Sequence, residues 1–125
     1  MNLAVWILIA VGGGIGACLR FIIDGLITRH VRSGFPWGIL VINVVGSLIL
    51  GLFTGLAGSS ILDVHWLVIL GGGVIGGFTT FSTAMVDTVK MLERRTWGRF
   101  AANAFGMLVL AVAAAMLGLA LGRAV

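Results

Sequence analysis

The stretch GGVIGGFTTFST, residues 72–83, interrupts an apolar segment and decides the fold of the chain. It places four glycines, four hydroxyl side chains and two phenylalanines in twelve positions, between WLVIL (66–70) and AMV (84–86). Each glycine inside a helix costs about 1 kcal/mol relative to alanine, and β-branched threonines lower helix stability further. The stretch therefore predicts a helix that is broken near residues 76–80.

The composition of the chain indicates that its solvent is lipid. Of 125 residues, 60% are hydrophobic, and only 8 basic and 4 acidic residues carry a formal charge. A soluble domain has about a quarter charged residues, so this chain has too little polar surface to coat a core in water. Its one cysteine, Cys18, excludes a disulfide within a single copy and a multi-cysteine metal site.

Charged residues occur in clusters, and the gaps between the clusters have the length of a bilayer. A hydrocarbon core about 30 Å thick needs about 20 helical residues. We therefore expect an all-α membrane protein, one membrane domain over residues 1–125, with four transmembrane helices of which the third is broken. The predicted spans are about 3–28, 36–57, 65–90 and 98–122.

Small residues four positions apart recur in every predicted span. The pairs are Gly12/Gly16, Ser47/Gly51, Gly51/Gly55, Gly72/Gly76 and Gly118/Gly122. Lipid supplies no hydrophobic force between helices, so helices in a bilayer associate through close backbone approach over small side chains. We expect tight packing within the bundle and against another copy.

The few polar side chains inside the predicted spans are the candidates for function. Asn43 forms an interhelical hydrogen bond or donates to a pathway. Arg20 forms an ion pair with Asp24 one turn later or attracts anions at a vestibule. The broken helix either lines a cavity, where freed carbonyls bind a cation and helix ends face an anion, or is a kink in which hydroxyls bond to carbonyls.

Three motifs, taken together, resemble the Fluc (CrcB) family of small dual-topology fluoride channels. They are GGGIGACLRF (12–21), PWGILVINVVGS (36–47) and GGFTTFST (76–83), and the resemblance covers essentially the whole chain. It implies an antiparallel dimer with two fluoride pores, no enzyme chemistry, and a multi-pass location in a bacterial-type plasma (inner) membrane.

The resemblance also implies a set of site residues. It maps the fluoride pore onto Asn43, Phe81, Ser82, Thr83 and, near the vestibule, Arg20. It maps the backbone carbonyls that hold a structural Na⁺ at the dimer centre onto Gly76 and Thr79. Such donors suit fluoride, which is small and tightly hydrated, and an aromatic ring presents a positive edge to an anion.

The chain departs from the family pattern in its phenylalanines and its fourth span. The second phenylalanine position is Ala84, and residues 100–125 contain no Ser or Thr, which leaves Asn103 as the one uncharged polar side chain. Both departures bear on whether each of two pores in a homodimer conducts.

The basic residues are also unevenly distributed. One predicted side of the membrane holds six of the eight Lys and Arg residues: Arg29, Arg32, Lys90, Arg94, Arg95 and Arg99. The positive-inside rule then predicts a single orientation with both termini outside, whereas a dual-topology chain should show little bias.

The alternatives to a homodimeric channel are therefore a structural or partly degenerate subunit of a heterodimer with an oppositely biased paralogue, and a small multidrug or guanidinium exporter. The exporter is disfavoured because it needs a glutamate in the first span, and the only glutamate is Glu93, in a predicted loop.

Overall fold

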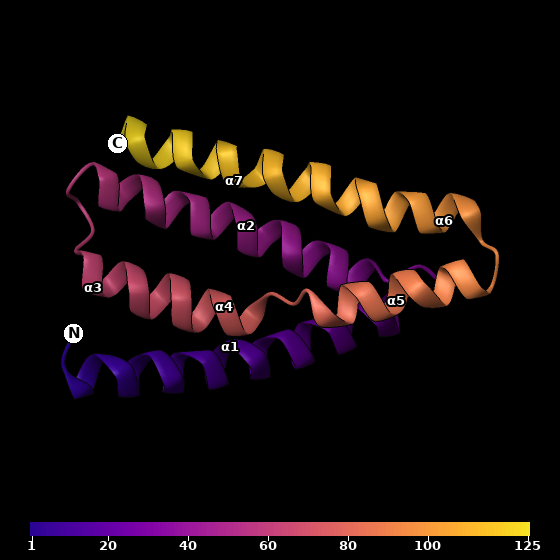
Figure 1. Cartoon of the computed structure of the whole chain (residues 1–125), viewed down its shortest axis with the longest axis horizontal. Coiled ribbons are helices and arrows are strands. Elements are labelled where there is room, and N and C mark those ends of the chain that lie inside the picture. Colours follow the sequence, from indigo (N-terminus) through magenta and orange to yellow (C-terminus); the bar gives the residue numbers. More distant parts are fainter.

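The computed structural model describes all 125 residues, which form helices and no strands (Figure 1). Four helical spans are long and apolar enough to cross a membrane: Leu3–His30, Trp37–Gly58, Val64–Glu93 and Trp97–Ala124. They run alternately up and down in chain order, so both termini lie at the same end (Figure 1). The predicted four-helix membrane fold is confirmed.

The first two spans are single helices, whereas the third and fourth are composite. The first two spans are α1 (Leu3–His30) and α2 (Trp37–Gly58). The third span consists of α3 (Val64–Trp66), the π-helical η1 (Leu67–Ile75), α4 (Gly76–Phe78) and α5 (Ser82–Glu93). The fourth span consists of α6 (Trp97–Ala101), the π-helical η2 (Ala102–Gly106) and α7 (Met107–Ala124).

The third span is interrupted at residues 79–81, between α4 and α5. Thr79 adopts extended angles, φ −79° and ψ 159°. The prediction of a break is confirmed, but its expected start at residue 76 is wrong, because Gly76–Phe78 is helical. The reason is packing: a Cβ on Gly77 would collide with the backbone of Gly13 in α1, so this glycine allows close helix contact instead of unwinding the chain.

The break lets the third span change its neighbours. Before it, η1 and α4 pack along α1; after it, α5 packs against α6 and η2 (Figure 1). The second span packs against η1 and α4 before the break and against α5 after it, and it also packs along α7. A continuous third helix would have to keep one set of neighbours along its length.

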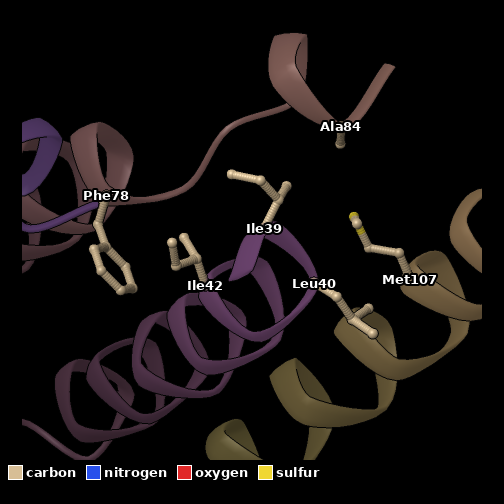
Figure 2. Close-up of a cluster of buried hydrophobic side chains, with 6 residues drawn as sticks. All are labelled: Ile39, Leu40, Ile42, Phe78, Ala84 and Met107. Atoms are coloured by element: carbon tan, nitrogen blue, oxygen red, sulfur yellow. The ribbon is translucent and has the colours of Figure 1, made fainter. Parts of the chain in front are cut away.

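A buried apolar cluster holds both ends of the break against α2 (Figure 2). Its members are Ile39, Leu40, Ile42, Phe78, Ala84 and Met107. Phe78 precedes the break and Ala84 follows it, while Ile39 and Ile42 of α2 lie between them and Leu40 lies beside Met107 (Figure 2). The interruption is therefore anchored on both sides by packing.

The interface of α2 with α7 confirms the expectation of close contact over small residues. A Cβ on Gly55 would lie 2.6 Å from the Leu119 carbonyl oxygen, and one on Gly122 would lie 2.5 Å from that of Leu52. These distances leave no room for a methyl group, so the two backbones touch.

The pair Gly72/Gly76 behaves differently. Both residues are exposed, and an added Cβ at either would meet atoms only at 3.8 Å or beyond, within the same span. This pair does not serve packing inside the subunit. Only 22 of the 125 residues are buried, so most apolar side chains are exposed or only partly buried within the subunit.

Candidate ion pathway at the broken helix

The side chain of Asn43 holds the interrupted backbone of the third span. Its Nδ2 donates to the Thr80 carbonyl oxygen at 2.8 Å, and its Oδ1 accepts from the Thr80 N–H at 2.9 Å. The amide thus pairs with both backbone groups of one residue, as a neighbouring strand would. The interhelical hydrogen bond considered from the sequence is present.

The same contact diverts a hydrogen bond from the α-helical ladder. Thr79 N–H still donates to the Ile75 carbonyl at 2.9 Å. The next N–H, that of Thr80, would close a turn on the Gly76 carbonyl but donates to Asn43 instead. The Gly76 carbonyl oxygen therefore lacks the hydrogen-bond partner that an unbroken α-helix would give it, as expected at the end of a helix segment.

Arg20 reaches the break from α1. Its Nη1 donates to the Thr79 carbonyl oxygen at 3.1 Å, which places a positive charge at the interruption. The alternative ion pair of Arg20 with Asp24 is not formed; the one salt bridge in the structure joins His65 and Asp63. Of the two carbonyls expected to bind sodium, that of Thr79 thus already accepts from a guanidinium.

A groove of about 440 Å³ opens beside the break, between α2, the start of α5 and the fourth span. Asn43, Thr79, Thr80 and Phe81 line it from the second and third spans. The Phe81 side chain is 78% exposed, so within a single subunit it packs against little. The groove brings together Asn43 and Phe81, two of the predicted pore residues.

Two more of the predicted pore residues, Ser82 and Thr83, begin α5 and are both exposed. The Thr83 N–H donates to the Thr80 hydroxyl at 3.2 Å, so a residue of the break pairs with one of the free N–H groups in the first turn of this helix. Thr83 does not line the groove at the break; it lines a second hollow that opens toward the basic end of the bundle, with Asp24, Asp87, Lys90 and Arg94. Thr83 thus faces a different hollow from Asn43 and Phe81, although it bonds to Thr80, the residue that Asn43 holds.

Three lining residues were not singled out as site residues from the sequence. Ser47 donates its hydroxyl to the Asn43 carbonyl at 2.7 Å, one turn along α2. The sulfur of Met107 lies 3.3 Å from Asn43 Nδ2. Asn103 supplies the fourth-span wall. The spacing of Ser47 and Asn43 was visible in the sequence, whereas the positions of the other two depend on the path of the fourth span.

Asn103 is 2% exposed and connects the fourth span to α5. Its Nδ2 donates to the Thr88 hydroxyl at 2.8 Å, which in turn donates to the Ala84 carbonyl at 2.7 Å. Its Oδ1 is buried without a hydrogen-bond partner. Ala84 itself is 2% exposed and belongs to the apolar cluster, so this position contributes to packing in this chain.

Asp63 lies at the opposite end of the bundle, before α3. The backbone N–H of His65 donates to Asp63 Oδ1 at 2.8 Å, and the His65 ring lies 2.9 Å from the same oxygen. These hydrogen bonds favour the ionised carboxylate and lower the pKa of Asp63 below its ordinary value of 3.8. The pair caps a short helix far from the groove.

The fold and the groove define a small multi-pass membrane protein in which one span is opened and lined with hydrogen-bonding groups. The family model described as "CrcB-like protein, Camphor Resistance (CrcB)" matches residues 7–119. The chain belongs to this CrcB family.

Curated relatives cover nearly the full length. The chain is 44% identical to "Fluoride-specific ion channel FluC 1" of Leifsonia xyli, over 91% of this chain and 83% of the relative. It is 43% identical to "Fluoride-specific ion channel FluC" of Novosphingobium aromaticivorans, over 94% of both chains. It is 40% identical to the protein of the same name from Opitutus terrae, over 93% of this chain and 90% of the relative.

Proposed function

We propose that the chain is a subunit of a fluoride-selective channel that lets fluoride leave the cytoplasm passively, with no catalytic step. The observation that carries this proposal is the Asn43 amide bonded to the open backbone of Thr80 inside a groove at the break. The names of the relatives and the four apolar spans support the same function in a bacterial membrane.

The Asn43 amide has a hydrogen to offer to an anion. One of its two N–H groups donates to the Thr80 carbonyl at 2.8 Å, and Nδ2 also contacts the Met107 sulfur at 3.3 Å. A thioether is a weak acceptor, so fluoride, a far stronger acceptor, displaces it at little cost. The amide thus binds the anion while it keeps the backbone in place.

Phe81 and Arg20 supply the remaining attraction. The Phe81 ring is exposed beside the groove, and its edge is the positive end of its quadrupole. The Arg20 guanidinium lies on the Thr79 carbonyl with no carboxylate bonded to it, so its charge raises the local concentration of anions. We place Ser82 and Thr83 on the route that leads from the groove along α5.

The break also suits a sodium ion. No cluster of three or more His, Cys, Asp or Glu side chains is present, so the expected ligands are the carbonyl oxygens of Gly76 and Thr79, the type of donor that hard cations and broken membrane helices use. The Thr79 carbonyl would have to give up its bond to Arg20 or share its second lone pair with the ion. Sodium would supply a fixed positive charge at this point. Two oxygens do not enclose an ion, so we propose that a second copy supplies the same pair.

A second chain fits the exposed face of the third span. Gly72 and Gly76 lie on the outside of the subunit, one turn apart, in the pattern by which membrane helices approach closely. We propose that two chains pack antiparallel over this stripe. The partner is a second copy or a paralogue of opposite charge bias, since Arg29, Lys90 and the basic residues that follow α5 lie at one end of the bundle.

Fluoride efflux from liposomes tests the function. Purified protein, alone and with a candidate paralogue, should release trapped fluoride at a rate that does not depend on a proton gradient, and should retain chloride. Release by the protein alone supports the homodimer, and release only with the paralogue supports the heterodimer. A C-terminal tag on the chain, expressed without the paralogue, should then be found on both faces of the membrane for the homodimer and on one face for the heterodimer. No fluoride release from either preparation would refute the proposed channel function.

A further inference from the structure

We propose that an anionic phospholipid of the surrounding membrane binds in a slot between the start of α2 and the start of the fourth span, with its phosphate on Arg99. The slot has a volume of about 320 Å³ and is lined by Ser33, Phe35, Trp37, Gly98, Arg99 and Ala102. It is separate from the groove at the break, and the proposal is independent of ion conduction.

The two walls of the slot are joined through Ser33. The Ser33 carbonyl oxygen accepts from Arg99 Nη2 at 3.0 Å, and the Ser33 hydroxyl accepts from Trp37 Nε1 at 2.9 Å. Phe35 packs against Trp37 with ring centroids 4.8 Å apart. The guanidinium and the indole are thus positioned before any ligand arrives, which lowers the entropic cost of binding.

The backbone beside the slot is shaped to admit the guanidinium. Gly34 has a φ of +76°, a left-handed conformation that side chains rarely adopt, and a Cβ there would lie 2.8 Å from Arg99 Nη1. Glycine therefore allows Arg99 to lie against the loop that connects α1 to α2. One nitrogen of the guanidinium bonds to the loop, and its other N–H groups are available to a ligand.

The positive charge of Arg99 favours an anionic ligand in the slot. No carboxylate oxygen lies within 4.0 Å of Arg99, since the single salt bridge is that of His65 with Asp63 at the other end of the bundle. Guanidinium groups match the geometry of phosphate oxygens with two parallel hydrogen bonds. The remaining basic residues of this end (Arg29, Arg32, Lys90, Arg94, Arg95) add a positive potential around it.

The position of the slot favours a lipid as the source of that phosphate. Trp37 and Trp97 are 42% and 61% exposed at this end of the spans, and indole side chains lie at the level of the headgroups. Gly98 and Ala102, one turn apart on the fourth span, form an open, uncharged side of the slot. Basic pockets between membrane helices on the positive side bind anionic headgroups in this manner.

Native mass spectrometry of the purified, full-length protein tests the site. The protein is incubated with equal amounts of phosphatidylglycerol and phosphatidylcholine that carry the same acyl chains. We expect preferential retention of phosphatidylglycerol, and about a tenfold loss of that preference in Arg99→Gln, the effect of losing one charge-assisted hydrogen bond to the phosphate. Arg29→Gln removes a charge at the same end but outside the slot and should keep the preference.

A second variant separates the site from the stability of the loop. Ala102→Phe fills the slot and retains Arg99, so it should lose the preference for phosphatidylglycerol without loss of the Ser33 contacts. An equal decline in Arg99→Gln and Arg29→Gln would refute the site, because diffuse charge would then explain binding. Thermal stabilisation by inorganic phosphate equal to that by phosphatidylglycerol would refute a lipid as the ligand.

Discussion

Replacement of Asn43 by alanine should lower fluoride flux and protein stability together, by amounts that the structure allows us to work out. The change removes the bonds to the Thr80 carbonyl and N–H, at 2.8 and 2.9 Å. An unpaired backbone group that is fully buried costs about 1–3 kcal/mol. Thr80 is half-buried beside a groove, so the lower end applies, and the total is about 2 kcal/mol.

A loss of this size corresponds to a fall in melting temperature of roughly 5–10 °C for a chain of this length. The assay pairs thermal unfolding in detergent with fluoride efflux from liposomes. Asn43→Asp provides a comparison: its carboxylate still accepts from the Thr80 N–H but offers no donor and repels an anion. It should therefore abolish flux although it retains one of the two hydrogen bonds.

Thr54→Val on α2 serves as the matched control, because its hydroxyl bonds only to the Leu50 carbonyl of its own helix, at 2.8 Å on an exposed face. It should leave both melting temperature and flux unchanged. Fluoride flux that survives in Asn43→Ala and Asn43→Asp would refute the assignment of Asn43 to the pathway. An unchanged melting temperature in the alanine variant would refute the structural part of the reasoning.

Three other predictions concern the Phe81 ring, the glycine contacts between helices and the hydrogen bonds of Asp63. Phe81→Ala should lower fluoride efflux while the dimer stays assembled on size exclusion, because the ring is 78% exposed within the subunit; unchanged efflux would remove Phe81 from the pore. Gly118→Ala should lower the free energy of unfolding by about 1–3 kcal/mol in thermal unfolding, because its Cβ would collide with the backbone of Leu48. The control Gly14→Ala should leave stability unchanged, because its Cβ meets no atom within 4 Å. The pKa of Asp63, followed by NMR, should lie below 3.8 and should rise only in part in His65→Ala, because the backbone N–H of residue 65, the larger cause of the lowered pKa, remains. Because this pKa is depressed in the folded state, its stabilisation is present above about pH 4 and is lost as the pH falls through the folded pKa.

Local sequence was sufficient to predict the number of spans and the presence of a break. Charge-free segments of bilayer length define spans whatever their neighbours are, and the adjacent glycines and threonines of residues 76–80 weaken a helix wherever they occur. The structure confirms both features, and the contacts of Gly55 and Gly122 confirm the expectation for small residues.

The start of the break could not be predicted because it depends on a contact between residues far apart in sequence. Gly77 stays helical since it packs on Gly13 of another span, and a sequence pattern carries no information on that neighbour. The two π-helical segments, η1 and η2, were missed for a similar reason. Their i→i+5 hydrogen bonds have no signature in the spacing of apolar residues.

The sequence singled out candidate site residues one by one but could not show their arrangement. Asn43 stood out as an amide in an apolar span, yet its pairing with Thr80 requires the third span to cross α2 at this level. Arg20 was expected near a vestibule, whereas it bonds to Thr79 at the break itself. Ala84 marked a departure from the family pattern, and the structure assigns it to the buried cluster beside Met107.

The most direct test is a fluoride titration in lipid bilayers, followed by NMR on the Asn43 side-chain amide and the Thr80 backbone N–H. Saturable shifts of both signals with fluoride, absent with chloride and absent from the indole of the exposed Trp97, are the predicted result. Signals that stay fixed across the titration, with helical carbon shifts at residues 79–81, would contradict an anion route along an opened third span.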